Sequence, residues 1–282
     1  MQVIIELRPS IKLDRLLRVT GMSRSTFYYW NKELQRPDKY QSEKLAIQQI
    51  YHQHKGRYGY RRITSLMRRQ GHMINHKTVQ RLMQQLGLKS RVRIKRYKSY
   101  RGNVGKIAPN LLQRQFKADQ PNEKWVTDVT EFKVSNQKLY LSTVLDLYNG
   151  EIIAHQIEDR PVYGLVKEML IKAFAKLKDQ DKPILHSDQG WQYQMKSYQK
   201  VLQQRGIQQS MSRKGNCLDN AVMENFFGLL KTELYYLEKF ESSQQLKSAL
   251  EEYIDYYNHE RIKLKLKGLS PVEYRTQPLL AA

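Results

Sequence analysis

The sequence predicts a chain in two parts, in which an all-α region precedes an α/β domain whose mixed five-stranded sheet carries flanking helices. Three observations predict this order. Helical periodicity dominates residues 11–88, strand-like apolar segments begin only near Trp125, and the later strands alternate with helices. With 282 residues, the chain has the length of about two domains of ~150 residues each.

The excess positive charge is confined to the first part of the chain. The sequence contains 49 Lys and Arg against 27 Asp and Glu, a net charge of +22. Residues 1–118 hold 27 of the basic residues and only 5 of the acidic ones, so residues 119–282 are neutral overall. A general solubility charge is the alternative explanation, but it would not collect in one part of the chain. The distribution therefore indicates a nucleic-acid-binding region joined to a second domain.

Composition also excludes several classes of protein. The mean hydropathy is −0.71, and the sequence has no apolar run of the ~18 residues that a membrane span needs, so no membrane partner is expected. Residues 1–10 lack the long apolar region of a signal peptide. The single cysteine, Cys217, excludes an internal disulfide and a cysteine zinc cluster. We therefore expect a cytoplasmic protein.

Residues 1–40 predict an N-terminal helix-turn-helix. The apolar residues of segment 11–20 follow a helical period, and Gly21 supplies a turn after them. Ser23 is placed to cap a second helix that includes residues 23–30. Two helices joined by a tight turn with glycine fit the DNA-binding motif, and a plain helical hairpin remains the alternative.

Residues 41–88 predict a second helical DNA-binding region, with helices near residues 43–54, 60–70 and 74–86. Its charges are almost all positive, which favours contacts with DNA phosphates over the alternative of an ordinary solvated helix face. The basic residues concerned are Arg57, Arg61, Arg62, Arg68, Arg69, Lys77 and Arg81.

Residues 89–118 predict a basic linker. The stretch 89–106 has no acidic residue and no clear period, and two tyrosines lie among its basic side chains. Such a segment can lie along a phosphate backbone. The DNA contacts expected from it are Arg91, Arg93, Lys95 and Arg96, with further basic residues at Lys89, Lys98, Arg101 and Lys106.

Residues 119–282 form the predicted α/β domain. Three strand-like segments joined by short turns predict an antiparallel meander. Two shorter apolar strands then alternate with helices, which indicates a mixed sheet covered by helices. The strands are expected near residues 124–132, 138–148, 150–157, 183–187 and 206–211, and the helices near residues 161–177, 197–205, 214–233 and 242–261.

Three acidic residues of this domain stand out. Asp128 lies inside a strand, where burying an unpaired carboxylate is costly, and Asp188 follows a short buried strand. Glu224 lies on the more polar face of a helix, where Gly228 leaves room for a bulky ligand. Singly, they have ordinary alternatives: a satisfied strand-edge residue, a turn former and a solvated helix residue. Together they can hold two Mg²⁺ or Mn²⁺ ions, which promote phosphodiester chemistry.

The motifs around these acids carry a family resemblance. The segments WVTDVT, HSDQG and NCLDNAVMENFFGLLKTE occur in this order, with 35 residues between Asp188 and Glu224. Over residues 43–275 the chain closely resembles the DDE transposases and retroviral integrases, and specifically the second-reading-frame (OrfB) product of the IS-three family of bacterial insertion sequences. The resemblance implies a ribonuclease H-like integrase catalytic core, a catalytic and metal-binding triad of Asp128, Asp188 and Glu224, and a DNA-contacting Lys231.

The same resemblance implies an activity and partners. The expected reaction is metal-dependent strand cleavage and strand transfer at the ends of an insertion sequence, that is, DNA transposition, recombination and integration. The expected cofactor is Mg²⁺ or Mn²⁺, as two ions. The expected partners are DNA (terminal inverted repeats and target DNA), the product of an upstream reading frame, supplied separately or as a frameshift fusion, and further copies of the chain on DNA. The expected location is the nucleoid of a bacterial cytoplasm.

Other side chains near the triad have two interpretations each. Arg213 and Lys214, in the loop before the last motif, are predicted to contact DNA phosphate, and a solvated loop is the alternative. His186 either orients a carboxylate or water, or packs at the strand end. Asp219 is predicted to be a helix N-cap and not a metal ligand. The residues expected in the core or in the wall of the site are Trp125 and Trp191.

Two other functions remain open at this level. A non-catalytic DNA-binding regulator would use only the basic region, but it would have no need of three placed acids. A ribonuclease H-like nuclease without strand transfer would use the acids, but the helix-turn-helix region favours action at a specific DNA end.

Overall fold

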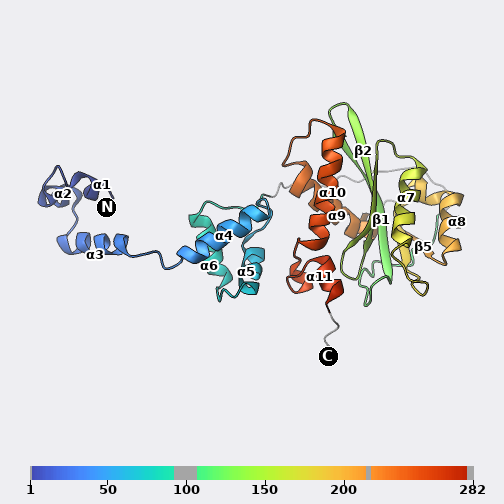
Figure 1. The fold of residues 1–282 in the computed structure, drawn as a ribbon, viewed down its shortest axis with the longest axis horizontal. Coiled ribbons are helices and arrows are strands. Elements are labelled where there is room, and N and C mark those ends of the chain that lie inside the picture. The colour runs from blue at the N-terminus through green and yellow to red at the C-terminus, as the bar shows by residue number, and fades with distance from the viewer. Residues whose placement is uncertain (1, 92–106, 214–216, 278–282) are drawn as a thin grey trace.

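The computed structural model describes residues 2–91, 107–213 and 217–277, and it follows the predicted order of helices and strands (Figure 1). The first helices lie at one end of the molecule, a second group of helices follows, and the sheet domain forms the other end. Within the described ranges, none of the helices combines the length and the hydrophobicity that a bilayer-spanning segment needs.

The first three helices form a small unit with its own core. Gly21 takes the left-handed conformation at the end of the second helix (φ 66°), and the Ser23 hydroxyl accepts a bond from the main-chain N–H of Thr26. These features confirm the predicted turn and cap. The sequence did not predict the first helix, whose 6 residues are too few for a clear period. The helices are α1 (Gln2–Leu7), α2 (Leu13–Thr20) and α3 (Arg24–Gln35), and their buried core is Ile4, Leu16, Leu17 and Phe27.

The next three helices pack through apolar faces with helical spacing. Val79, Leu82 and Met83 are the buried residues of the third of them, as the periodicity predicts. Asn75 caps this helix by accepting a bond from the main-chain N–H of Lys77. The helices are α4 (Gln41–Gln53), α5 (Tyr60–Arg69) and α6 (His76–Gln85).

The five strands form one mixed sheet, as predicted. They are β1 (Lys124–Val134), β2 (Gln137–Asp146), β3 (Ile152–Glu158), β4 (Ile184–Ser187) and β5 (Gln208–Met211). The first three pair antiparallel, which confirms the meander, whereas β4 pairs parallel with both β1 and β5. The spatial order is β3-β2-β1-β4-β5, so β1 lies in the centre between the antiparallel and the parallel parts.

Helices cover both faces of this sheet (Figure 1). Successive residues of β1 point to opposite faces. Trp125 therefore packs in the core beneath α7 and α8, while Val126 packs in the core beneath α9 and α10. The helices are α7 (Tyr163–Phe174), α8 (Lys196–Gln204), α9 (Ala221–Leu230), α10 (Ser243–His259) and α11 (Pro271–Thr276).

The helix predicted over residues 214–233 is correct in its middle and different at its ends. A 3₁₀ turn, η2 (Cys217–Asn220), precedes α9, and a π-helical turn, η3 (Lys231–Tyr235), follows it. Apolar spacing does not distinguish these windings from an α-helix over so few residues.

The second group of helices shares its core with the sheet domain. Ile63 of α5 and Val79 of α6 belong to the same buried cluster as Phe226 of α9. The Tyr58 hydroxyl donates to the carbonyl oxygen of Glu260 and accepts from the main-chain N–H of Ile262, both at 3.0 Å. Residues 41–88 therefore pack against the segment that follows α10, and they are not an isolated unit.

Candidate active site

Asp128 lies in the middle of β1. Its side chain is partly buried, and its Oδ1 atom accepts a hydrogen bond from the main-chain N–H of Val129 at 2.7 Å. Burial raises the pKa of this carboxyl well above its ordinary value; the charges of Asp188 and Glu224 raise it further, and Lys231 opposes them. Three carboxylates therefore share one electrostatic environment.

Asp188 directly follows β4, the parallel neighbour of β1. Val126 pairs with His186 in this ladder, and Asp128 and Asp188 each lie two residues further along the chain. The charge of Asp188 raises the pKa of Asp128, so the two carboxylates lie near one another. The Asp188 Oδ1 atom accepts a bond from the main-chain N–H of Gly190 at 2.8 Å. Burial raises the pKa of Asp188, and this hydrogen bond opposes the shift.

Glu224 lies in the first turn of α9 and stays partly exposed, while its neighbour Met223 and the later Phe226 are buried. One turn further on, a side chain at Gly228 would meet nothing within 4 Å. The surface beside Glu224 is therefore open enough for a large ligand to approach.

Lys231 begins the π-helical turn η3. Its Nζ atom lies 5.2 Å from the centre of the Phe132 ring, which belongs to the same strand as Asp128. Its positive charge lowers the pKa of Asp128. One basic side chain therefore joins the three acidic ones on this side of the sheet.

The chemistry of the three acids fits divalent cations. Carboxylate oxygens are the hard ligands that Mg²⁺ and Mn²⁺ prefer. A bound dication would stabilise the ionised form of Asp128, which burial and the neighbouring negative charges disfavour. In the described residues, no three His, Cys, Asp or Glu side chains stand close enough together to hold a metal ion as they are. The Oδ1 atoms of Asp128 and Asp188 bind main-chain N–H groups instead.

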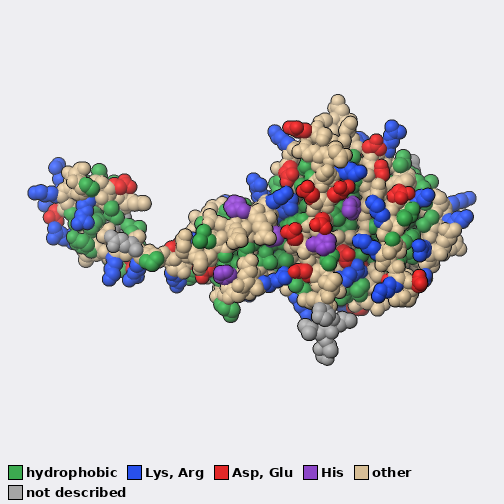
Figure 2. Space-filling view, in the orientation of Figure 1, with side chains coloured by type: hydrophobic (Ala, Val, Ile, Leu, Met, Phe, Trp, Pro, Cys, Tyr) green, Lys and Arg blue, Asp and Glu red, His purple; other side chains and the backbone are tan. Residues whose placement is uncertain are grey.

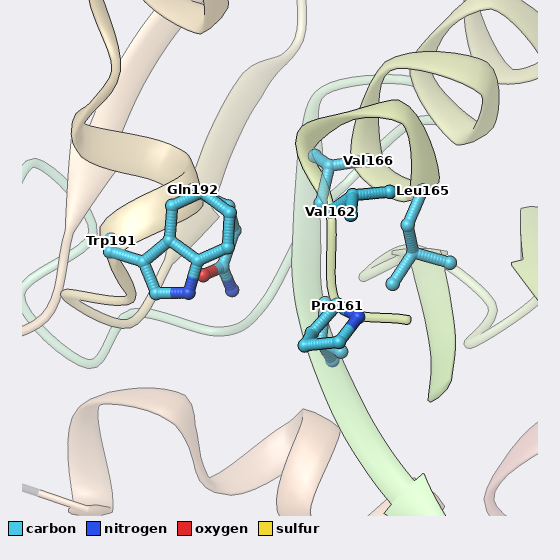
Figure 3. Close-up of a pocket in the computed structure, with 7 residues that line it drawn as sticks. Pro161, Val162, Leu165, Val166, Trp191 and Gln192 are labelled. Carbon is cyan, nitrogen blue, oxygen red and sulfur yellow. The ribbon is translucent and has the colours of Figure 1, made fainter. Parts of the chain in front are cut away.

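A small apolar notch lies between the start of α7 and the turn that follows Asp188 in the chain (Figure 3). Trp191, three residues after Asp188, faces Pro161, Val162 and Leu165 across it. Val129 and Val166 complete the wall with Gln192. Trp191 is 54% exposed and forms a wall of this notch, whereas Trp125 is fully buried and belongs to the core.

Known proteins resemble the chain over nearly its whole length. It is 59% identical over 277 residues to InsK of Escherichia coli K12, described as a transposase for insertion sequence element IS150, and the match covers 98% of both chains. It is 32% identical over 281 residues to the transposase InsF of insertion sequence IS3A from the same strain, covering 95% of both. The chain belongs to the IS-three family of DDE transposases. As a transposase it is a polynucleotidyl transferase that acts in DNA transposition and integration.

Two kinds of domain family match the transposase from residue 38 onward. Residues 118–217 and 224–279 match the integrase core domain, and residues 38–96 match the HTH-like domain. A chain of the solved simian T-cell lymphotropic virus intasome, in complex with PP2A regulatory subunit B56 gamma, has the same fold. The TM-score is 0.50 at 20% identity, covering 80% of this chain and 73% of that one. The fold is therefore ribonuclease H-like, preceded by a helical DNA-binding region.

Two arginines predicted to contact DNA point into the transposase. Arg57 is only 5% exposed, and its Nε atom donates to the carbonyl oxygen of Glu233 at 3.1 Å. An Nη atom of Arg62 lies 3.8 Å from the Glu233 carboxylate, and burial lowers the pKa of Arg62. The prediction is wrong for Arg57, because its guanidinium is buried against a residue far along the chain. The DNA contact of Arg62, whose side chain is 25% exposed, stays a prediction.

The other predicted DNA contacts are exposed or lie outside the described residues. Arg61, Lys77 and Arg81 are exposed on α5 and α6, and Arg91 is exposed after them. On the face shown in Figure 2, Lys and Arg dominate over the first helices, and the acidic side chains gather mainly over the sheet domain. The predicted contacts that fall outside the described residues are Arg93, Lys95, Arg96 and Lys214.

Asp219 does not cap α9, although the sequence predicted it to do so. Asn220 occupies the N-cap position without a side-chain bond. Asp219 is fully buried and accepts bonds from Arg213 (main-chain N–H, Nε and Nη2), Arg114 and Asn110 at 2.9–3.0 Å. Arg213 therefore binds a carboxylate of its own chain, although its side chain remains 59% exposed. Sequence periodicity offered no sign of a partner as distant as Arg114.

His186 is a packed strand-end histidine. It is fully buried, and its ring nitrogens lie 2.8 Å from the Ser210 hydroxyl and 2.9 Å from the carbonyl oxygen of Asp219. Burial lowers its pKa. It therefore fixes the segment before α9 and does not touch the carboxylate of Asp188.

Proposed function

We propose that Asp128, Asp188 and Glu224 are the metal ligands and catalytic residues of this transposase, and that they hold two Mg²⁺ or Mn²⁺ ions. The observation that carries the proposal is the placement of Asp128 on β1, Asp188 just after its parallel neighbour β4 and Glu224 in the first turn of α9. The charges of Asp188 and Glu224 add to the effect of burial in raising the pKa of Asp128, which supports this grouping. When bound, such ions activate the attacking oxygen and stabilise the leaving oxygen of a phosphodiester.

The chain's own residues position the DNA strand in this proposal. The open surface at Gly228 lets the strand reach Glu224, and Lys231 binds a phosphate beside the scissile bond. No Ser or Tyr nucleophile is required, because water attacks first and the freed 3′-OH then attacks a second phosphodiester. Cleavage followed by joining at the element's ends is the resulting activity.

The DNA substrate is proposed to be the terminal inverted repeats and a target duplex. Exposed Arg61, Lys77 and Arg81 supply phosphate contacts from α5 and α6, and the basic stretch 89–106 extends them. The same charge supports association with the nucleoid.

Two kinds of protein partner complete the proposal. One carboxylate site acts on one scissile bond at a time, so two copies of the chain on DNA would process the two element ends together. The product of an upstream reading frame is proposed to add recognition of the terminal repeats, either as a separate chain or as a frameshift fusion.

A cleavage and joining assay tests this function. Duplexes ending in the element's inverted repeats are incubated with the full chain and Mg²⁺, Mn²⁺ or a chelator. Metal-dependent nicking and joining are expected. Nicking without joining would support a nuclease, and binding without either would support a regulator.

A further inference from the structure

Glu233 is a buried carboxylate just beyond the catalytic helix. It lies in the π-helical turn η3, two residues after Lys231, and its side chain is 3% exposed. The Arg261 guanidinium donates to both of its oxygens, from Nε at 2.8 Å and from Nη2 at 2.5 Å. The Tyr253 hydroxyl donates to it at 2.9 Å. All these partners come from α10 or the segment after it.

The second helical region reaches the same residue. Arg57 donates to the Glu233 carbonyl oxygen, and Arg62 of α5 approaches its carboxylate. The guanidinium carbon of Arg57 also lies 4.7 Å from the centre of the Tyr256 ring. One carboxylate therefore joins α5, η3 and the end of α10.

Three guanidinium groups surround this single acid. Burial opposes the ionisation of Glu233, but its hydrogen bond and charge pairing with Arg261 outweigh burial and hold its pKa below the ordinary value. Arg261 is itself only 2% exposed. Removing one partner from such a buried group leaves uncompensated charge, so the arrangement of the turn depends on Glu233.

The turn that Glu233 holds also carries Lys231. The main-chain N–H of Tyr236 donates to the carbonyl oxygen of Lys231 at 2.8 Å, a bond that spans five residues and belongs to π winding. Residues two apart in a helical turn project in different directions. Glu233 thus binds Arg261 on one side while Lys231 lies over Phe132 on the other.

We infer that Glu233 is a positioning residue for strand cleavage, which fixes Lys231 beside the carboxylate site and links it to the DNA-binding helix α5. The inference rests on the proposed function of the triad. On α5, Arg61 is exposed while the adjacent Arg62 turns toward Glu233, so the helix that receives DNA on one side contacts the catalytic turn on the other.

Cleavage kinetics test this role through Lys231. Glu233→Gln should lower the single-turnover cleavage rate about tenfold at saturating enzyme, with little change in Kd for end DNA. Adding Glu233→Gln to Lys231→Ala should cost little more than Lys231→Ala alone, because both changes act on one contact. If the two substitutions together reduced the cleavage rate by the product of their separate effects, the inference would be overturned. The matched control is Glu238→Gln, which alters an exposed acid of the same segment.

Two further variants distinguish a direct effect on cleavage from a loss of folding stability. Arg62→Met removes only the more distant α5 partner, at 3.8 Å, and leaves Arg261 bonded to Glu233. It should therefore slow cleavage while lowering the melting temperature less than Glu233→Gln does. Glu233→Gln combined with Arg62→Met restores part of the charge balance, so it should melt at a higher temperature than Glu233→Gln alone and still cleave slowly. Recovery of the cleavage rate together with stability would show a purely structural role and overturn the inference.

Hydrogen exchange tests the turn without relying on activity. Glu233→Gln should speed amide exchange at residues 231–236 and leave the strands of the sheet unchanged. Unchanged exchange in the turn, or equal acceleration throughout the sheet, would overturn the inference. Failure of the wild-type chain to cleave would instead count against the proposed function, and the exchange result would still decide the role of Glu233.

Discussion

Asp128 on β1 and Asp188 just beyond its parallel neighbour β4 each lie two residues past the pair Val126–His186, and each carboxylate accepts a hydrogen bond from a main-chain N–H close to it. Burial raises the pKa of both, and the charge of Asp188 adds to the shift at Asp128. Two carboxylates in such a place are unfavourable when both are ionised, unless a cation binds. The site is therefore expected to weaken the metal-free fold.

Asp128→Asn should raise the melting temperature of the metal-free protein near pH 7. A raised carboxyl pKa means that the native state binds protons more tightly than the unfolded state, whose Asp pKa is about 3.9. The wild type is thus most favoured below that value and loses stability as the pH rises through the folded pKa. The advantage of the variant should disappear in acid.

Thermal melts at several pH values, with a chelator and then with Mg²⁺, check this prediction. Added Mg²⁺ should stabilise the wild type more than the variant, since the variant lacks a ligand. Equal melting temperatures of the metal-free wild type and Asp128→Asn near pH 7 would mean that the ionised Asp128 carboxylate does not destabilise the fold.

Gly228 offers a test of the open surface beside Glu224. Gly228→Ala should stabilise α9 by about 0.5–1 kcal/mol, because alanine favours the helix and its methyl group meets nothing within 4 Å. Gly228→Leu should fold as well, yet block the approach of a DNA strand. Melting curves and cleavage assays on both variants separate the two effects. Full cleavage by the leucine variant would show that DNA does not pass over this position.

Asp219→Asn should lower the melting temperature at neutral pH. Bonds from Arg213 outweigh burial and hold the pKa of Asp219 well below its ordinary value. A lowered carboxyl pKa contributes stability above the unfolded value of about 3.9 and loses it as the pH falls through the folded value. The effect should be modest, because Arg213 and Arg114 are 59% and 44% exposed.

Melting curves of Asp219→Asn and of the wild type between neutral and acid pH check the direction of this pH dependence. The difference in melting temperature between the variant and the wild type should be largest at neutral pH and shrink below about pH 4. Asp255→Asn is a suitable control, because that acid is 71% exposed. A gap that does not change with pH would assign the stability to packing and not to charge.

The salt dependence of DNA binding separates outward from inward arginines. Alanine at Arg61, Lys77 and Arg81 should flatten the plot of log K against log salt by up to about 0.9 for each lost phosphate contact. Arg57→Met should leave the slope unchanged, since Arg57 is 5% exposed. A linker variant with alanine at Arg91, Arg93, Lys95 and Arg96 should flatten it for all sequences alike. Titrations on end and random duplexes measure these slopes; an unchanged slope in the linker variant would make the linker a spacer.

Periodicity predicted the elements of this fold well because each depends on nearby residues. The alternation around Asp128 and the apolar runs of the later strands required no knowledge of distant contacts. The π-helical winding after Leu230 could not be predicted in this way, because one extra residue in a turn barely alters the apolar pattern.

Long-range pairs were the main gap in the sequence prediction. Arg61 and Arg62 look alike in the sequence, and only the folded chain brings Glu233 to the second of them. Asp219 is of a residue type that often caps helices and lies just before α9. In the fold, however, its oxygens bind Arg114 from a distant segment, and its side chain is buried. The role of a charged residue depends on which opposite charge the folded chain places beside it. The pattern of neighbouring residues in the sequence does not contain that information.

Asp128, Asp188 and Glu224 are proposed to form together the metal-dependent strand-transfer site. The most direct measurement is cleavage and joining of element-end DNA by Asp128→Asn, Asp188→Asn and Glu224→Gln, alongside end binding by each variant. The wild type should form both products only with Mg²⁺ or Mn²⁺, and every variant should bind the end normally and form neither. Turnover retained by any of the three variants would contradict this proposal.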